Sequence, residues 1–82
     1  MAIFRIVELN GIGAENDHKD FQNYEECYKA FKKQRKYWRK FAEETAKIKT
    51  AIKEHTPFCY SLYQYNEIML TWEIIVLPND KV

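Results

Sequence analysis

The first residues of the chain alternate loosely between apolar and charged side chains. Residues 2–9 (AIFRIVEL) combine β-branched and aromatic residues with charges at Arg5 and Glu8, and an Asn10–Gly11 pair follows. This pattern predicts a strand that ends in a turn. The next residues, 11–23, hold both glycines of the chain and ionisable side chains of mixed sign without a period, so they predict a loop.

A helix is expected to begin at Asn23. Glu26 follows it by three residues, and together they can satisfy two free backbone donors as a capping box does. No glycine or proline occurs again before Pro57, and the residue before a proline avoids the helical backbone conformation, so the helix can run from Tyr24 to about His55, roughly 45 Å. Its apolar positions recur at spacings of three and four, with polar interruptions, at Tyr24, Cys27, Phe31, Trp38, Phe41, Ile48 and Ile52.

After Pro57 the apolar period changes from about 3.6 to two, which is typical of strands. Residues 58–65 and 70–77 each alternate, and Asn66–Glu67 offers a turn between them, so this part predicts a β-hairpin. Pro78 is expected to end the last strand, and residues 79–82 to form a frayed tail. The alternation does not decide which of its two sets of side chains faces the helix.

The predicted order is β-α-β-β in one domain, residues 1–82. We therefore expect a two-layer α+β fold in which one long helix packs on a three-stranded sheet with a C-terminal antiparallel hairpin. An eight-residue strand spans only about 27 Å, so a straight helix of that length would overhang the sheet. Either the helix breaks near Thr45, or the overhang packs on a second copy, with Phe31, Trp38 and Phe41 as anchors of a homodimer.

Composition narrows the class of protein. A chain of 82 residues is too short for a two-domain enzyme or a dinucleotide fold, and 46% hydrophobic residues are too many for a disordered chain. There is no apolar run long enough to cross a bilayer and no recognisable export signal. Cys27 and Cys59 do not resemble a disulfide framework, so we expect two reduced thiols in a cytoplasmic protein without a membrane partner.

Charge is distributed unevenly along the chain. The total is only +1, but residues 27–53 hold ten basic and two acidic side chains, a net charge of +8. Residues 1–26 carry a net charge of −4 and residues 54–82 a net charge of −3. The run KAFKKQRKYWRK places basic residues at three and four spacings on one helix face, with others beside it, which gives the candidate binding residues Lys32, Lys33, Arg35, Lys36, Tyr37, Arg39 and Lys40.

Three interpretations of this basic face stay open. It can dock an acidic protein surface, where charge speeds encounter and selects partners. It can follow nucleic-acid phosphates, with Tyr37 stacking on a base. It can also be a solvated helix face neutralised by the chain's own acids around Glu15, Asp17 and Asp20.

The hairpin carries a second candidate surface. If one helix covers one face of the sheet, the other face can present Tyr63 and Tyr65 together with Ile75 and Leu77, and exposed tyrosines are typical of protein interfaces. A second chain or the N-terminal loop covering this face is an equally simple interpretation.

Catalytic and metal-binding patterns are weak. The histidines and cysteines show no CxxC, HxxxH or HExxH spacing, and no metal or cofactor is expected. Cys59 and His55 can approach each other across the turn at Pro57, but nothing is placed to orient the imidazole, and His55 is expected at the helix C-terminus. The acids around His18 indicate a solvated loop.

These observations favour a non-enzymatic module that acts by binding. We expect a protein-interaction or inhibitor protein, for which a phage protein that targets its host or counters host defence is one suitable setting. The alternative is a nucleic-acid-binding protein that uses the basic helix face. The sequence names no partner.

Overall fold

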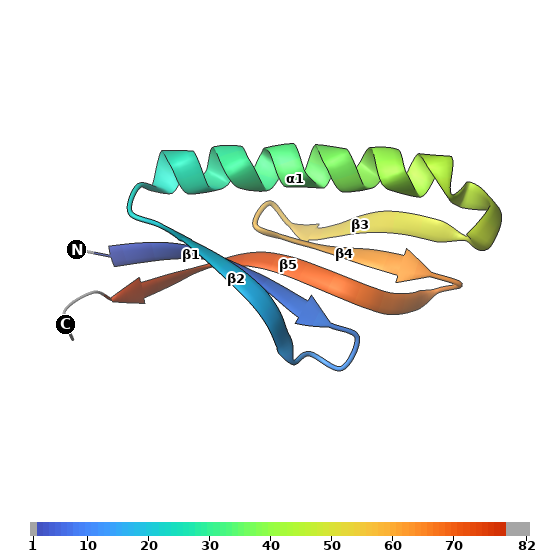
Figure 1. Cartoon of the computed structure of the whole chain (residues 1–82), viewed down its shortest axis with the longest axis horizontal. Coiled ribbons are helices and arrows are strands. Elements are labelled where there is room, and N and C mark those ends of the chain that lie inside the picture. The colour runs from blue at the N-terminus through green and yellow to red at the C-terminus, as the bar shows by residue number, and fades with distance from the viewer. Residues whose placement is uncertain (1, 79–82) are drawn as a thin grey trace.

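A computed structural model describes residues 2–78 of the chain (Figure 1). The elements in chain order are β1 (Ala2–Asn10), β2 (Glu15–Phe21), α1 (Tyr24–Glu44), the 3₁₀ turn η1 (Ala46–Ile48), β3 (Thr50–Thr56), β4 (Cys59–Gln64) and β5 (Glu67–Pro78). The five strands form one antiparallel sheet in the order β2-β1-β5-β4-β3, and α1 lies across one face of it (Figure 1). The fold is therefore α+β in two layers, while the tail predicted for residues 79–82 lies outside the described residues.

The sheet has five strands rather than the three predicted. The first additional strand, β2, occupies most of the segment expected to be a loop, and it pairs with β1 from Phe4 opposite Phe21 to Leu9 opposite Glu15. Its sequence, ENDHKDF, lacks an apolar alternation because β2 is an edge strand whose side chains are exposed except for Phe21. Backbone pairing with β1, not burial of side chains, holds it in the sheet.

The second additional strand, β3, comes from the segment expected to be the end of the helix. The start of α1 is as predicted, with the Asn23 side chain accepting a hydrogen bond from the Glu26 N–H at 3.2 Å. The helix ends at Glu44, because Thr45 leaves the helical conformation and Lys49 adopts a left-handed backbone with φ 59°. Of the two alternatives left open, the helix therefore breaks near Thr45, and the continuation to His55 is wrong.

The break removes the length conflict that suggested an overhanging helix. The 21 residues of α1 span about 31 Å. The 12 residues of β5 span about 40 Å. The helix therefore fits over the sheet, and no overhang is left to be buried by a second copy.

The register decides which alternate set of side chains faces α1. Trp72 lies opposite Tyr60 on β4 and Glu8 on β1, and all three point to the helix side of the sheet. Trp72, Tyr60, Phe31 and Cys27 have no exposed surface and form the centre of the core. Tyr60 also donates a hydrogen bond from its hydroxyl to Gln34 Oε1 at 3.1 Å, so the polar interruption in the helix seam satisfies a buried phenol.

A tight turn connects β1 to β2. At the β1–β2 turn, the Asn10 side chain accepts hydrogen bonds from the N–H groups of Ile12 and Ala14. Gly11 lies there against Ile68, whose carbonyl oxygen would be 2.7 Å from an added Cβ, so only glycine fits.

No helix within residues 2–78 is both long and apolar enough to cross a membrane.

Candidate macromolecular interface

The solvent side of α1 carries a row of lysines. We call this the lysine face, and its members are Lys29, Lys32, Lys33, Lys36 and Lys40. All five are exposed, since spacings of three and four residues keep them on one side of a helix whose other side packs on the sheet. Among the ion pairs within residues 2–78, none involves these lysines. The lysine face is therefore a surface of uncompensated positive charge.

The chain's own β2 acids do not neutralise this face, contrary to one of the three interpretations. Asp20 forms a two-point ion pair with Arg5, and Glu15 Oε2 lies 2.9 Å from the imidazole Nδ1 of His18. Asp17 accepts a hydrogen bond from the His18 N–H. These acids lie on β2, at the opposite edge of the sheet from β3, and there they interact with Arg5 and His18.

Two arginines of the basic run have a partner of their own. Arg35 Nη1 lies 2.8 Å from Glu54 Oε1, and Arg39 Nη2 is bonded to Glu54 Oε2. Glu54 belongs to β3, so the pair joins the flank of α1 to the edge strand. The guanidinium groups of Arg35 and Arg39 share the single carboxylate of Glu54, so one of their two positive charges is not neutralised. The side chain of Arg35 is 18% exposed and that of Arg39 is 49% exposed, so the free donors are mainly those of Arg39.

Tyr37 stands at the side of the lysine face. It is 64% exposed, and its ring packs edge-on against Trp38 with centroids 5.3 Å apart. A shallow depression of about 590 Å³ adjoins it, lined by Lys33, Lys36, Tyr37, Arg39, Lys40 and Glu43. The structure thus brings an exposed aromatic ring together with most of the basic residues singled out from the sequence.

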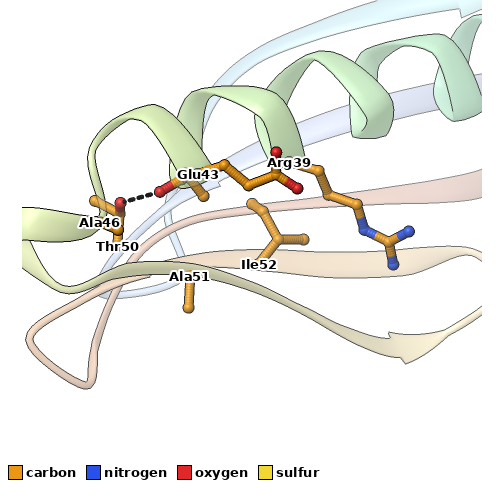
Figure 2. A pocket seen from close by; sticks show the side chains of 7 residues that line it. Arg39, Glu43, Ala46, Thr50, Ala51 and Ile52 are labelled. Atoms are coloured by element: carbon orange, nitrogen blue, oxygen red, sulfur yellow. Dashed lines mark hydrogen bonds between the residues drawn. The ribbon is translucent and has the colours of Figure 1, made fainter.

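A second hollow separates the C-terminal half of α1 from β3 (Figure 2). We call it the α1–β3 groove; it has a volume of about 380 Å³ and is lined by Arg39, Ala42, Glu43, Ala46, Thr50, Ala51 and Ile52. The alanines leave the space open because they have no side chain beyond Cβ. Thr50 bridges the groove by donating a hydrogen bond from Oγ1 to the carbonyl oxygen of Ala42 at 2.9 Å (Figure 2).

The residues expected as dimer anchors pack within this chain. Phe31 is fully buried and meets Tyr60 edge-on with centroids 5.0 Å apart, so its expected place in an exposed part of the seam is wrong. Trp38 stacks on Trp72 and is only partly exposed, as is Phe41. Both line an apolar hollow of about 330 Å³ near Met69.

The face of the sheet away from α1 carries the other aromatic candidate. Tyr63 lies there beside Lys53, whose Nζ is 4.8 Å from the centre of its ring, and Ile75 and Leu77 are half-buried on the same face. Tyr65 is not on this face, because it starts the β4–β5 turn with a φ of 51°. The aromatic patch is therefore smaller than the sequence suggested.

The polar groups on this open face are engaged with one another. His55 lies on β3 and not at a helix C-terminus, and its Nε2 is 2.9 Å from Ser61 Oγ, which in turn is 2.7 Å from Thr71 Oγ1. His55 thus bonds Ser61 and not the thiol of Cys59, with which a catalytic pair was considered. Burial raises the pKa of the Cys59 thiol, with a further contribution from Glu73, which disfavours the thiolate. Within residues 2–78, no three His, Cys, Asp or Glu side chains converge as a metal site would require.

The sequence pattern did not predict β3 or the α1–β3 groove. The available signals were the small residues Ala42 and Ala46 on one helix flank, the break at Thr45 and the short run before Pro57. Comparison with protein families, with curated proteins and with solved structures finds no match for this chain. Any functional assignment therefore depends on the surfaces themselves.

Proposed function

We propose that this protein is a small non-enzymatic interaction or inhibitor module that binds an acidic surface of a partner protein through the lysine face of α1 and Tyr37. The observation that carries the proposal is the row of five exposed lysines without an acidic partner in residues 2–78. Uncompensated charge of one sign accelerates encounter with the opposite sign and disfavours wrong partners. Tyr37 adds an aromatic contact of the kind enriched at protein interfaces.

The overall charge balance favours an acidic protein over nucleic acid. The chain has 13 basic and 12 acidic side chains, whereas nucleic-acid-binding domains are usually strongly basic overall. Residues 1–26 and 54–82 carry net charges of −4 and −3, and they would repel a phosphate backbone that extended over them. An acidic patch on a protein is confined in area and need not extend over them.

Nucleic-acid binding remains the alternative because of one feature. Tyr37 is exposed next to lysines, which is the combination that single-strand binding sites use to stack a base and hold its phosphates. In either case the module acts by binding, and a phage protein that blocks a host factor is a setting that suits a cytoplasmic domain of this size.

The test uses two probes and a matched pair of variants. Fluorescence anisotropy at low salt measures binding to labelled poly-L-glutamate and to random 20-residue oligonucleotides. Lys36→Glu reverses one charge on the lysine face, and Lys19→Glu on β2 makes the same change in net charge away from both the lysine face and β3. We expect the first variant to weaken polyglutamate binding about tenfold or more and the second to change it about twofold or less.

Two results would contradict the proposal. Equal losses in the two variants would show that only net charge matters and that the lysine face is not a site. Oligonucleotide binding at least about tenfold tighter than polyglutamate binding, and lost in the first variant alone, would establish the nucleic-acid alternative in its place.

A further inference from the structure

The outer edge of β3 is an open end of the sheet. β3 and β2 are the two edge strands. An edge strand offers unpaired backbone groups to another chain unless charges, prolines or bulges protect it. Both edge strands have one register irregularity, but only β2 is protected by charge, since most of its seven residues are charged. β3 has only Lys53 and Glu54 as charged residues, and Glu54 is held by the arginines of α1.

The hydrogen-bond pattern identifies which backbone groups of β3 point outward. The N–H of Tyr65 donates to the carbonyl oxygen of Lys49, and Thr50 lies opposite Gln64. In an antiparallel ladder this makes Thr50 and Gln64 a non-hydrogen-bonded pair, so pairing alternates along β3 from that point. The N–H and C=O groups of Thr50, Ile52 and Glu54 accordingly face away from β4, toward the open edge.

The α1–β3 groove lies directly beside this edge. Its small alanines, Ala42 and Ala46, leave room on the helix side for a side chain from an added strand (Figure 2). Arg39 also lines the groove, and its exposed donors carry the positive charge that Glu54 does not balance. Glu43 lies near the alanines and would repel an acidic side chain there. The groove therefore favours an apolar side chain beside Ala42 and Ala46 and an acidic side chain beside Arg39.

We propose that an extended acidic segment of the partner protein binds along β3 as a sixth strand, with an apolar side chain in the α1–β3 groove and carboxylates facing Arg39 and the neighbouring lysines. This proposal rests on the proposed function, because it names the form in which the acidic partner is bound. Strand addition derives affinity from main-chain hydrogen bonds and specificity from the pockets that alternate side chains enter.

Charge argues for an acidic segment and against a second copy of this chain. Pairing β3 with the β3 of another copy about a two-fold axis would bring the two α1 flanks together on the same face of the joined sheet. Each flank carries Lys32, Lys36 and Arg39, and like charges that meet across an interface oppose association. An acidic strand compensates the same charges.

The probe is a blocked nine-residue peptide in which threonine alternates with one valine and three glutamates. Its control is the same peptide with alternate backbone nitrogens methylated, which keeps every charge but prevents ladder pairing. Nuclear magnetic resonance follows the amide exchange of Ile52 and Glu54 in each complex. We expect the first peptide to slow exchange at both amides about tenfold or more, and the methylated peptide to bind about tenfold more weakly without protecting them.

A matched pair of variants tests the groove itself. Ala46→Glu places a carboxylate in the groove, and Ala14→Glu makes the same substitution in the β1–β2 turn; both positions are exposed, so both variants retain the fold. Only Ala46→Glu should weaken binding of the peptide. Equal effects of the two substitutions would overturn the proposed groove.

The possible failures are distinguishable. If the peptide perturbs the lysine face while the Ile52 and Glu54 amides exchange as in the free protein, strand addition is overturned and the proposed function stands. If neither the peptide nor polyglutamate binds, both proposals fail together. If the two amides are already protected in the free protein and lose protection on dilution, a second copy occupies β3 and the acidic segment is overturned.

Discussion

The indole rings of Trp38 on α1 and Trp72 on β5 stack with their centroids 4.9 Å apart and their planes at 29°. Tyr60 stacks on the same Trp72 ring with centroids 5.0 Å apart. Trp72 also donates a hydrogen bond from Nε1 to Glu8 Oε1 at 2.9 Å, so one residue ties the helix to three neighbouring strands of the sheet.

Replacing Trp72 should therefore be the most damaging single change. Trp72→Ala removes a fully buried ring, leaves a cavity and removes the hydrogen-bond donor of Glu8. It should therefore lower the free energy of unfolding by about 3–5 kcal/mol. Urea unfolding followed by circular dichroism measures it. Tyr37→Ala is the control, since that ring is 64% exposed and its loss should cost less than about 0.5 kcal/mol. Similar losses in the two variants would contradict this account of the core.

The junction of α1 and β3 depends on the Thr50 hydroxyl. Thr50 Oγ1 lies within 2.9 Å of the carbonyl oxygens of Ala42 and Thr45 and 2.6 Å from Thr45 Oγ1. Thr50→Val keeps the shape but removes these bonds, so it should lower the free energy of unfolding by about 1–2 kcal/mol. Thr50→Ser retains the hydroxyl and should recover about half or more of the loss in the same urea experiment. A valine variant as stable as the parent protein would show that the hydroxyl is dispensable.

The β4–β5 turn contains an avoidable strain. Tyr65 and Asn66 have φ of 51° and 66°, and positive φ at both central residues is the backbone of a type I′ turn, which Asn-Gly adopts most readily. Tyr65→Asn/Asn66→Gly should raise the free energy of unfolding by about 1 kcal/mol. Thermal unfolding measures the change, and Asn66→Gly alone shows how much is gained with the Tyr65 ring retained. A lower melting temperature in both variants would mean that the tyrosine ring stabilises the turn more than its backbone strains it.

The Arg5–Asp20 pair should make part of the stability dependent on pH. Arg5 Nε and Nη2 lie 2.6 and 2.9 Å from the two carboxylate oxygens of Asp20, and this hydrogen-bonded ion pair holds the pKa of Asp20 below its ordinary value of 3.8. A carboxyl group whose pKa is lower in the folded state contributes stability above the unfolded pKa and loses it as pH falls through the folded pKa. Asp20→Asn should thus cost up to about 1 kcal/mol near pH 6 and progressively less below about pH 4.

Urea unfolding at pH 6 and pH 2.5 gives the size of that effect. In an Arg5→Gln background the substitution at Asp20 should have little effect at either pH, because the ion pair is already absent. An undiminished cost of Asp20→Asn at pH 2.5 would rule out the ion pair as its cause.

The two thiols should react slowly in the folded protein. Cys27 is fully buried, and burial raises the pKa of both thiols, with Glu73 adding to the effect at Cys59. Since the thiolate is the reactive form, a disulfide reagent at pH 8 should modify the native protein at least about tenfold more slowly than the protein unfolded in guanidinium. Cys59→Ser leaves only the fully buried Cys27, which should react more slowly with the reagent. Cys27→Ser leaves only the half-buried Cys59, which should react faster. Native rates equal to the unfolded rate would contradict the burial of both groups.

The sequence alone determined those features that depend on neighbouring residues. The start of α1 at the Asn23 cap, the strands around Trp72 and the row of lysines all follow from turn chemistry, capping and periodicity over a few residues. The expected lengths of the helix and the strands conflicted, which indicated that the helix either breaks or overhangs the sheet. Local patterns could not decide between these two, because the decision depends on how the chain packs after Thr45.

Only the tertiary structure decided what depends on distant partners. β2 is a strand because its backbone pairs with the edge of β1. Its polar side chains do not alternate with apolar ones, so the sequence does not indicate this pairing. Glu54 neutralises part of the basic run because the chain reverses after Thr45 and returns beside α1, which places residues 35, 39 and 54 together. The α1–β3 groove exists for the same reason: small side chains on a helix become a hollow only when an edge strand lies alongside them.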